Sequence, residues 1–129
     1  MKVLLDTHVW LRWITEPEGL PAKAASILER RENEVLFSVA SSWEIAIKYA
    51  LGKLPLPEPP ERFVPPRLMR DGIATLHIEH RHALHVASLP PHHHDPFDRI
   101  LIAQAQLEGI PIITADTKFA AYDVDVIWK

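Results

Sequence analysis

The chain of 129 residues is 47% hydrophobic, which suits one domain, residues 1–129, with a core of its own. Its 14 basic and 17 acidic residues give a net charge of −3 with histidine neutral, so the overall charge indicates neither nucleic-acid nor anionic-membrane binding. The absence of cysteine excludes disulfides and thiolate sites, and without a signal-peptide core or a membrane-length apolar run we expect a cytoplasmic protein.

The first part of the chain alternates short apolar runs with helical patterns. Residues 2–5, KVLL, predict a buried strand that ends at Asp6. Large apolar residues three and four apart predict a helix from Thr7 to Ile14. Residues 21–31 predict a second helix, which begins with proline and ends with two arginines, and Val35 to Val39 predicts the second strand.

The middle of the chain contains a helix signal followed by a proline-rich stretch. We expect a helix to open at Ser41, because Glu44 stands three residues later in the S-x-x-E capping arrangement, and to end at Gly52. Residues 54–66 contain six prolines, which favour an extended connector over a helix or a central strand. Residues 73–78 predict the third strand.

The most distinctive stretch is DPFDRILIAQAQLEGIPIITAD, which begins at Asp95 and ends at Asp116. Asp95 followed by proline is a helix-entry signal, so Asp98 falls at the third helical position. We expect this helix to end at Gly109. Residues 111–114 then predict a short buried strand, with Asp116 just past its carboxyl end.

Two further elements complete the pattern, a short helix at residues 80–87 and a terminal edge strand at residues 124–128. Strands alternate with helices along most of the chain. We therefore predict an α/β fold with a central parallel sheet in three layers, α/β/α. In open parallel sheets, chemistry lies outside the carboxyl ends of the strands.

The acids expected at this edge of the sheet are Asp6, Glu44, Asp98 and Asp116. Each has a structural alternative, because an acid at a helix start or in a turn can act as a cap. Together, four carboxylates in one pocket would raise each other's pKa values, and a divalent cation resolves that conflict. All-oxygen ligands without cysteine favour Mg²⁺ or Mn²⁺ over zinc, and such an ion suits phosphodiester cleavage by an activated water.

Four stretches, LLDTHVWLRW, SVASSWEIAIK, DPFDRILIAQA and PIITAD, in this order and spacing, resemble the PIN-domain ribonucleases of the VapC toxin group over nearly the whole chain. The positions that match the family's catalytic, metal-binding acids are Asp6, Glu44, Asp98 and Asp116. Thr114 matches a hydroxyl residue that supports the site, and Asp95 reads first as a helix cap and second as an auxiliary acid. The resemblance implies a Mg²⁺-dependent endoribonuclease, usually a homodimer, inhibited by a cognate antitoxin whose C-terminal segment enters the acidic groove.

Several histidines have metal-like spacing, but we expect structural or surface roles for them. The run from His92 to His94 precedes a helix cap and is expected in an exposed loop. His82 and His85 could face one side of a helix, yet nothing supplies further ligands, so surface or RNA contact is the better interpretation.

Other residues leave alternatives open. Lys48 and Arg99 suit either an ordinary salt bridge or a phosphate contact, and the tryptophans Trp10, Trp13 and Trp43 are expected in the core rather than as base-stacking platforms. Two rival functions use the same acids. One is a DNA-directed nuclease, and the other is a catalytically silent binding module whose acidic groove captures a basic peptide.

Overall fold

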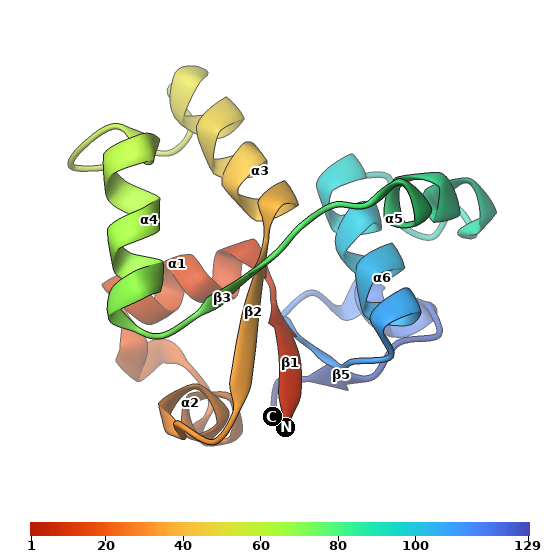
Figure 1. Cartoon of the computed structure of the whole chain (residues 1–129), viewed down its shortest axis with the longest axis horizontal. Helices are drawn as coiled ribbons and strands as arrows, with labels where there is room; N and C mark the ends of the chain where they lie inside the picture. The colour runs from red at the N-terminus through yellow and green to blue at the C-terminus, as the bar shows by residue number, and fades with distance from the viewer.

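The computed structural model describes residues 1–129 as a five-stranded parallel sheet with helices on both faces (Figure 1). The strand order is β3-β2-β1-β4-β5, and every neighbouring pair is parallel. The strands are β1 (Lys2–Leu5), β2 (Glu34–Ser38), β3 (Ala74–Leu76), β4 (Ile112–Ile113) and β5 (Val126–Ile127). The α/β class is confirmed, as is the last strand's place at the edge.

Six α-helices and three short 3-10 turns connect the strands. The helices are α1 (Thr7–Thr15), α2 (Ala22–Glu29), α3 (Val39–Ala50), α4 (Pro60–Arg70), α5 (His80–His85) and α6 (Pro96–Glu108). The 3-10 turns are η1 (Pro17–Gly19), η2 (Val86–Ser88) and η3 (Thr117–Ala121). No helix combines the length and the apolar character that crossing a membrane requires.

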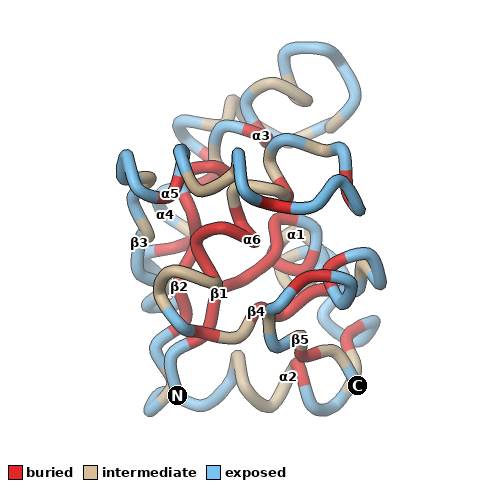
Figure 2. Tube along the Cα trace, turned by 90° about the vertical axis from the view of Figure 1, so that its right-hand side faces the viewer, coloured by how far each residue is buried: buried red, intermediate tan, exposed pale blue.

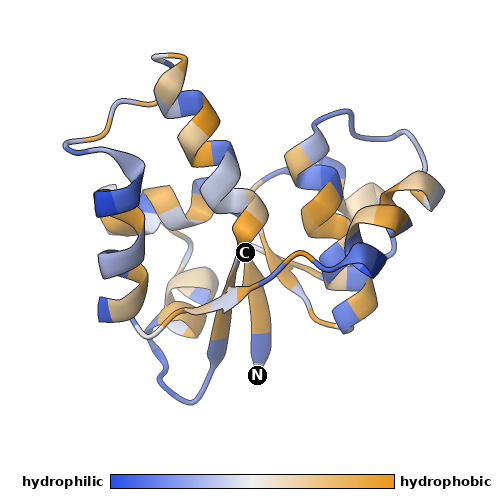
Figure 3. Cartoon of the chain, turned by 45° about the horizontal axis from the view of Figure 1, so that its top comes forward, coloured by the Kyte–Doolittle hydropathy of each residue, from blue (hydrophilic) through white to orange (hydrophobic).

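Side chains of the central strand divide the core into two parts. Val3 and Leu5 pack on one face with residues of α1, α2 and α4, whereas Leu4 packs on the other with α6. This division follows from the alternation of side chains along a strand. Trp10 and Phe63 anchor the first part, and burial of each such side chain stabilises the fold by roughly 1.5–3 kcal/mol. Buried residues follow β1 and β2 in Figure 2, and hydrophobic residues fill most of β1 in Figure 3.

Helix α3 begins earlier than the sequence predicts. Its N-cap is Ser38, the last residue of β2, whose hydroxyl accepts a hydrogen bond from the Ala40 N–H at 3.0 Å. The predicted capping box at Ser41 is therefore wrong, because a serine at the strand end already caps the helix. Ser41 lies buried inside the helix and accepts a 2.6 Å hydrogen bond from the Thr7 hydroxyl.

The proline-rich stretch is helical in its second half, which corrects the predicted extended connector. Pro60 occupies the first turn of α4, where its missing N–H costs nothing. Pro65 and Pro66 lie inside the helix, so two carbonyls one turn earlier lose their usual N–H partners. The two carbonyls belong to Glu61 and Arg62, which are exposed like the prolines themselves, so water can hydrogen-bond them. Burial of Phe63 and its apolar neighbours on the sheet stabilises the helix despite this loss.

The topology brings three strand ends together. Strand β1 lies between β2 and β4, and Leu5 is in register with Phe37 on one side and Ile113 on the other. All three strands point the same way, so the segments that follow them emerge at one edge of the sheet. Asp6 and Thr114 are therefore neighbours.

Candidate active site

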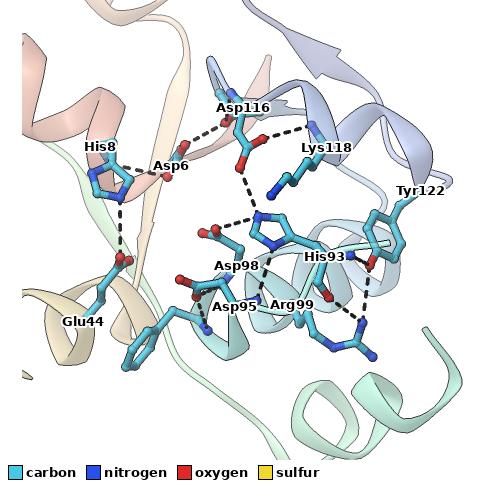
Figure 4. Close-up of polar contacts among 12 residues, drawn as sticks. Asp6, His8, Glu44, His93, Asp95, Asp98, Arg99, Asp116, Lys118 and Tyr122 are labelled. Atoms are coloured by element: carbon cyan, nitrogen blue, oxygen red, sulfur yellow. Dashed lines mark hydrogen bonds and ion pairs between the residues drawn. The ribbon is translucent and has the colours of Figure 1, made fainter. Parts of the chain in front are cut away.

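The four predicted acids lie at this carboxyl edge of the sheet, together with residues from the loop before α6 (Figure 4). Asp6, Glu44 and Asp98 are buried, with 3%, 1% and 8% of their surface exposed, while the side chain of Asp116 is about one-third exposed, at 32%. Asp6 caps α1, Glu44 comes from α3, Asp98 from the first turn of α6, and Asp116 follows β4. Segments far apart in the sequence thus contribute to one acidic cluster.

Asp6 and Asp116 are connected through Thr114. The Thr114 hydroxyl donates to Asp6 Oδ2 at 2.7 Å and accepts from the Asp116 backbone N–H at 3.0 Å. The register of β1 and β4 creates this contact, because it places the residues after Leu5 and Ile113 side by side. Thr114 therefore fixes the position of one carboxylate and of the backbone that carries another.

Asp6 and Asp116 can each cap a helical segment and also take part in the acidic cluster, because a carboxylate has two oxygens. Oδ1 of Asp6 accepts from the His8 N–H at 3.3 Å, and Oδ1 of Asp116 accepts from the Lys118 N–H at 2.9 Å. In each case Oδ2 makes the contact within the site. Asp95 is the N-cap of α6, as predicted, and its Oδ1 accepts hydrogen bonds from the backbone N–H groups of Phe97 and Asp98 at 2.9 and 3.1 Å.

Glu44 is held ionised by basic neighbours. Its Oε2 accepts from Lys48 Nζ at 2.5 Å and lies 3.5 Å from His8 Nε2. Burial opposes ionisation, but the hydrogen bonds from His8 and Lys48 lower the pKa of Glu44 to about 2. The same hydrogen bond with Glu44 raises the pKa of His8. The second oxygen, Oε1, is buried without a partner.

Asp98 has the opposite electrostatic environment. Burial, followed by the charges of Asp6, Asp95, Glu44 and Asp116, raises the pKa of Asp98 to about 8. Its Oδ1 is buried without a hydrogen-bond partner. Burial also raises the pKa of Asp6. The protein alone therefore provides too little positive charge for all of these carboxylates.

His93 is the residue of this site that the sequence did not reveal. We expected an exposed loop at residues 92–94, yet His93 is 7% exposed, and its Nε2 lies 2.9 Å from Asp98 Oδ2 and 3.0 Å from Asp116 Oδ2. Nδ1 accepts from the Asp95 N–H at 3.3 Å, which places the ring proton on Nε2. The imidazole thus donates toward two carboxylates at once.

The loop that carries His93 is fixed by Arg99 and Tyr122. The His93 N–H donates to the Tyr122 hydroxyl at 2.8 Å, and that hydroxyl donates to the Pro90 carbonyl at 2.8 Å. The Arg99 guanidinium donates to backbone carbonyls on both sides of the loop, those of Val86, Leu89, Pro90 and His93, at 3.0–3.2 Å. Arg99 therefore makes neither of the two contacts left open by the sequence.

The other histidine prediction is also corrected. His82 is fully buried, its Nδ1 accepting from the Glu79 N–H at 3.0 Å and its Nε2 lying 2.9 Å from Glu108 Oε2. Both ring nitrogens are used, so His82 joins α5 to α6 and offers nothing to a metal or to RNA. His85 makes a similar 2.7 Å contact with Gln106.

The tryptophans divide between core and surface. Trp10 is buried, as expected, but Trp43 is 53% exposed, which contradicts its assignment to the core. Trp43 precedes Glu44 on α3, so its side chain leaves the helix on a different face. It packs edge-on against Phe97 with ring centroids 5.0 Å apart.

The cluster fits a divalent cation. Two buried carboxylate oxygens, Glu44 Oε1 and Asp98 Oδ1, have no partner, and an unpaired buried anionic oxygen is costly. Carboxylate oxygens of Asp98 and Asp116 also lie within 4.8 Å of one another. Carboxylate oxygens dominate the donor set, which is the chemistry that Mg²⁺ and Mn²⁺ prefer.

Known proteins resemble this chain in part of its sequence and in its fold. A curated relative, ribonuclease VapC16 from Mycobacterium tuberculosis, is 48% identical over 60 residues, a stretch that covers 46% of this chain and 43% of the relative. VapBC2 from Rickettsia felis, crystallised with a promoter DNA fragment, superposes with a TM-score of 0.75 at 16% identity over the whole of both chains. DNA-bound VapBC from Salmonella typhimurium superposes with a TM-score of 0.73 at 16% identity, over 98% of this chain and 97% of that one.

These structural likenesses establish the fold. The family assignment comes from the sequence, because the family model for the PIN domain matches residues 3–125. That stretch contains the strands β2, β3 and β4, all of β1 but its first residue, and all six α-helices, and it ends just before β5. The chain belongs to the PIN-domain family.

Proposed function

We propose that the protein is a metal-dependent endoribonuclease and the toxin of a toxin–antitoxin pair. The observation that carries the proposal is the cluster of Asp6, Glu44, Asp98 and Asp116, with two buried carboxylate oxygens left unpartnered. A relative named as a ribonuclease supports the choice of RNA as substrate. Membership of the PIN-domain family supports hydrolysis as the reaction.

The four acids are the proposed ligands of Mg²⁺, with Mn²⁺ as an alternative. A bound divalent cation supplies a water of lowered pKa and positive charge against the phosphate. Thr114 orients Asp6, and His93 orients Asp98 and Asp116 through its Nε2–H. Lys48 and His8 keep Glu44 ionised and therefore able to bind a cation. Asp95 serves mainly as the helix cap that fixes the start of α6.

The proposed protein partner is an antitoxin whose basic segment enters the acidic cluster. Arginine pairs with carboxylates through two parallel hydrogen bonds, and Asp98 with its unpartnered oxygen is a suitable acceptor. The solved structures that share this fold include a toxin–antitoxin complex from Klebsiella pneumoniae, with a TM-score of 0.63 at 20% identity over 97% of this chain and 95% of that one.

We further propose a homodimer that covers the outer face of α3. Val39 and Trp43 are one turn apart on that helix, and both are exposed, at 37% and 53%. Large apolar side chains gathered on one surface commonly mark an interface between proteins.

Cleavage of matched RNA and DNA oligonucleotides decides among the candidate functions. We expect the purified wild type to cut RNA in Mg²⁺ or Mn²⁺, to stop in excess chelator, and to resume when metal is restored. Asp98→Asn should be inactive in the same preparation, which controls for contaminating nucleases. Preferential cutting of DNA would support the rival nuclease, and no cutting of either would support the binding module.

A further inference from the structure

A pocket of about 400 Å³ opens beside the acidic cluster, on the far side of Glu44. Two lysines and a histidine bring positive or polar groups to it, and three aliphatic side chains supply its apolar walls. The lining residues are Thr7, His8, Leu11, Glu44, Ile45, Lys48, Lys53 and Leu54, and Glu44 is the one acid among them, with Lys48 and His8 as its basic partners. We refer to it below as the cationic pocket.

The end of α3 builds this pocket. Gly52 adopts a left-handed conformation, with φ of 72°, and the Lys53 N–H returns to donate to the Lys48 carbonyl at 2.9 Å. This is the hydrogen bond of a Schellman motif, which reverses the chain after a helix. The reversal brings Lys53 into the same pocket as Lys48, and the next residue, Leu54, completes a wall.

The cationic pocket and the acidic cluster share the side chain of Glu44. Lys48 Nζ lies 2.5 Å from Glu44 Oε2, whereas the Lys53 side chain makes no ion pair anywhere in the structure. An acidic cluster repels a polyanion except where a cation intervenes, so the phosphates beside the cleaved one need positive charge from the protein. Arg99 is unsuited to this task, because its guanidinium is bonded to backbone carbonyls. Lys53 has a free ammonium group next to the site.

We propose that the cationic pocket binds one nucleotide of single-stranded RNA next to the cleaved bond. The phosphate lies against the ammonium groups of Lys53 and Lys48, and the base or sugar packs on the aliphatic walls of Leu11 and Leu54. The volume falls in the range of small-molecule sites, about 300–1,000 Å³. RNA-binding proteins commonly take up single bases that have left the stack. This inference rests on the proposed ribonuclease function and identifies where the substrate strand continues.

The first test is the salt dependence of RNA binding, measured with the inactive Asp98→Asn protein and a single-stranded oligoribonucleotide in Mg²⁺. Adding Lys53→Gln should weaken binding severalfold and reduce the slope of log Kd against log salt by about 0.7, the value for one phosphate contact to a single strand. Lys23→Gln is the matched control, since Lys23 is exposed on α2 at the opposite end of the sheet (Figure 1). An equal slope in the two lysine variants would overturn the proposal.

The second test locates the contact on the RNA. One phosphate at a time is replaced by an uncharged methylphosphonate, and affinity is measured for proteins with and without Lys53→Gln. At one position adjacent to the cut, the affinity lost through the methylphosphonate and the affinity lost through Lys53→Gln should not add, because both changes remove the same contact. Additive losses at every position, or weaker binding of an acidic peptide with RNA affinity unchanged, would refute the nucleotide pocket.

Failure of this inference is separable from failure of the proposed function. If wild type does not cleave RNA, the ribonuclease proposal falls. If wild type cleaves RNA and Lys53→Gln behaves like Lys23→Gln in KM and in salt dependence, the ribonuclease proposal stands and the pocket has no part in it.

Discussion

The pKa of Asp98 gives the acidic cluster a measurable effect on stability. Burial and the charges of Asp6, Asp95, Glu44 and Asp116 raise this pKa from 3.8 to about 8. Between pH 4 and pH 8 the metal-free folded protein therefore holds a proton that the unfolded chain has released. The free energy of unfolding should fall as pH rises through this window, since the folded state binds more protons there.

Asp98→Asn removes this titration, so the variant should lose less stability between pH 5 and pH 8 than the wild type. It should also be the more stable of the two at pH 8 without metal, because it relieves repulsion among the remaining carboxylates. Urea unfolding of both proteins in chelator at pH 5, 6.5 and 8 measures the difference. Parallel pH profiles would mean that Asp98 titrates normally in the folded protein.

His93 should act on metal affinity through Asp98 and Asp116. In His93→Ala both carboxylates lose their common donor, and loss of such a supporting contact typically weakens metal binding about 10–100-fold. His93→Gln, which retains an N–H donor, should recover part of the affinity. Calorimetric titration with Mn²⁺ measures the metal affinity, and His94→Ala, at an exposed histidine, is the control. Tighter binding in His93→Ala would instead show that the imidazole competes with the ion.

At the residue scale, the sequence predicts the acids better than their neighbours. Asp6, Asp95 and Asp116 follow strands or precede helices, so local rules of capping place them. His93 has no such local signal. Its position depends on Tyr122, nearly thirty residues later, and on Arg99, which together close the loop.

Helix α5 depends on one buried histidine. His82→Ala removes the acceptor of the Glu79 N–H and the partner of Glu108, and leaves a cavity under the helix. We expect a loss of about 2–4 kcal/mol in the free energy of unfolding. The exposed His80→Ala should change it by less than about 0.5 kcal/mol. Denaturant unfolding compares the two, and an equally small effect of His82→Ala would show that the buried contact contributes little.

At the element scale, strand and helix types follow the sequence pattern closely, and the errors have local causes. The sequence predicts the N-cap of α3 three residues too late, because both Ser38 and Ser41 can cap a helix and the contact of Ser41 with Thr7 forms only in the folded chain. The sequence does not predict helix α4, because its prolines favour an extended chain although its apolar residues share one face of a helix. Propensity disfavours that helix, whereas burial of Phe63, Val64 and Leu68 favours it.

For the whole molecule, the alternation of strands and helices predicts a parallel sheet but not the order of its strands. That order places β1 between β2 and β4 and makes one site from segments more than a hundred residues apart. The joint pattern of acids, rather than any single one, carries the functional prediction. At the sheet edge, Asp6 and Asp116 each cap the following segment with Oδ1 and contact another residue of the cluster with Oδ2.

Anomalous diffraction from crystals soaked in Mn²⁺ tests directly whether this acidic cluster is a metal centre. We expect an anomalous peak within ligand distance of Asp98, bordered by Asp6 and Asp116, and no such peak in crystals of Asp98→Asn. A peak only elsewhere on the protein, or none at the carboxyl edge of the sheet, would contradict a metal centre in this cluster.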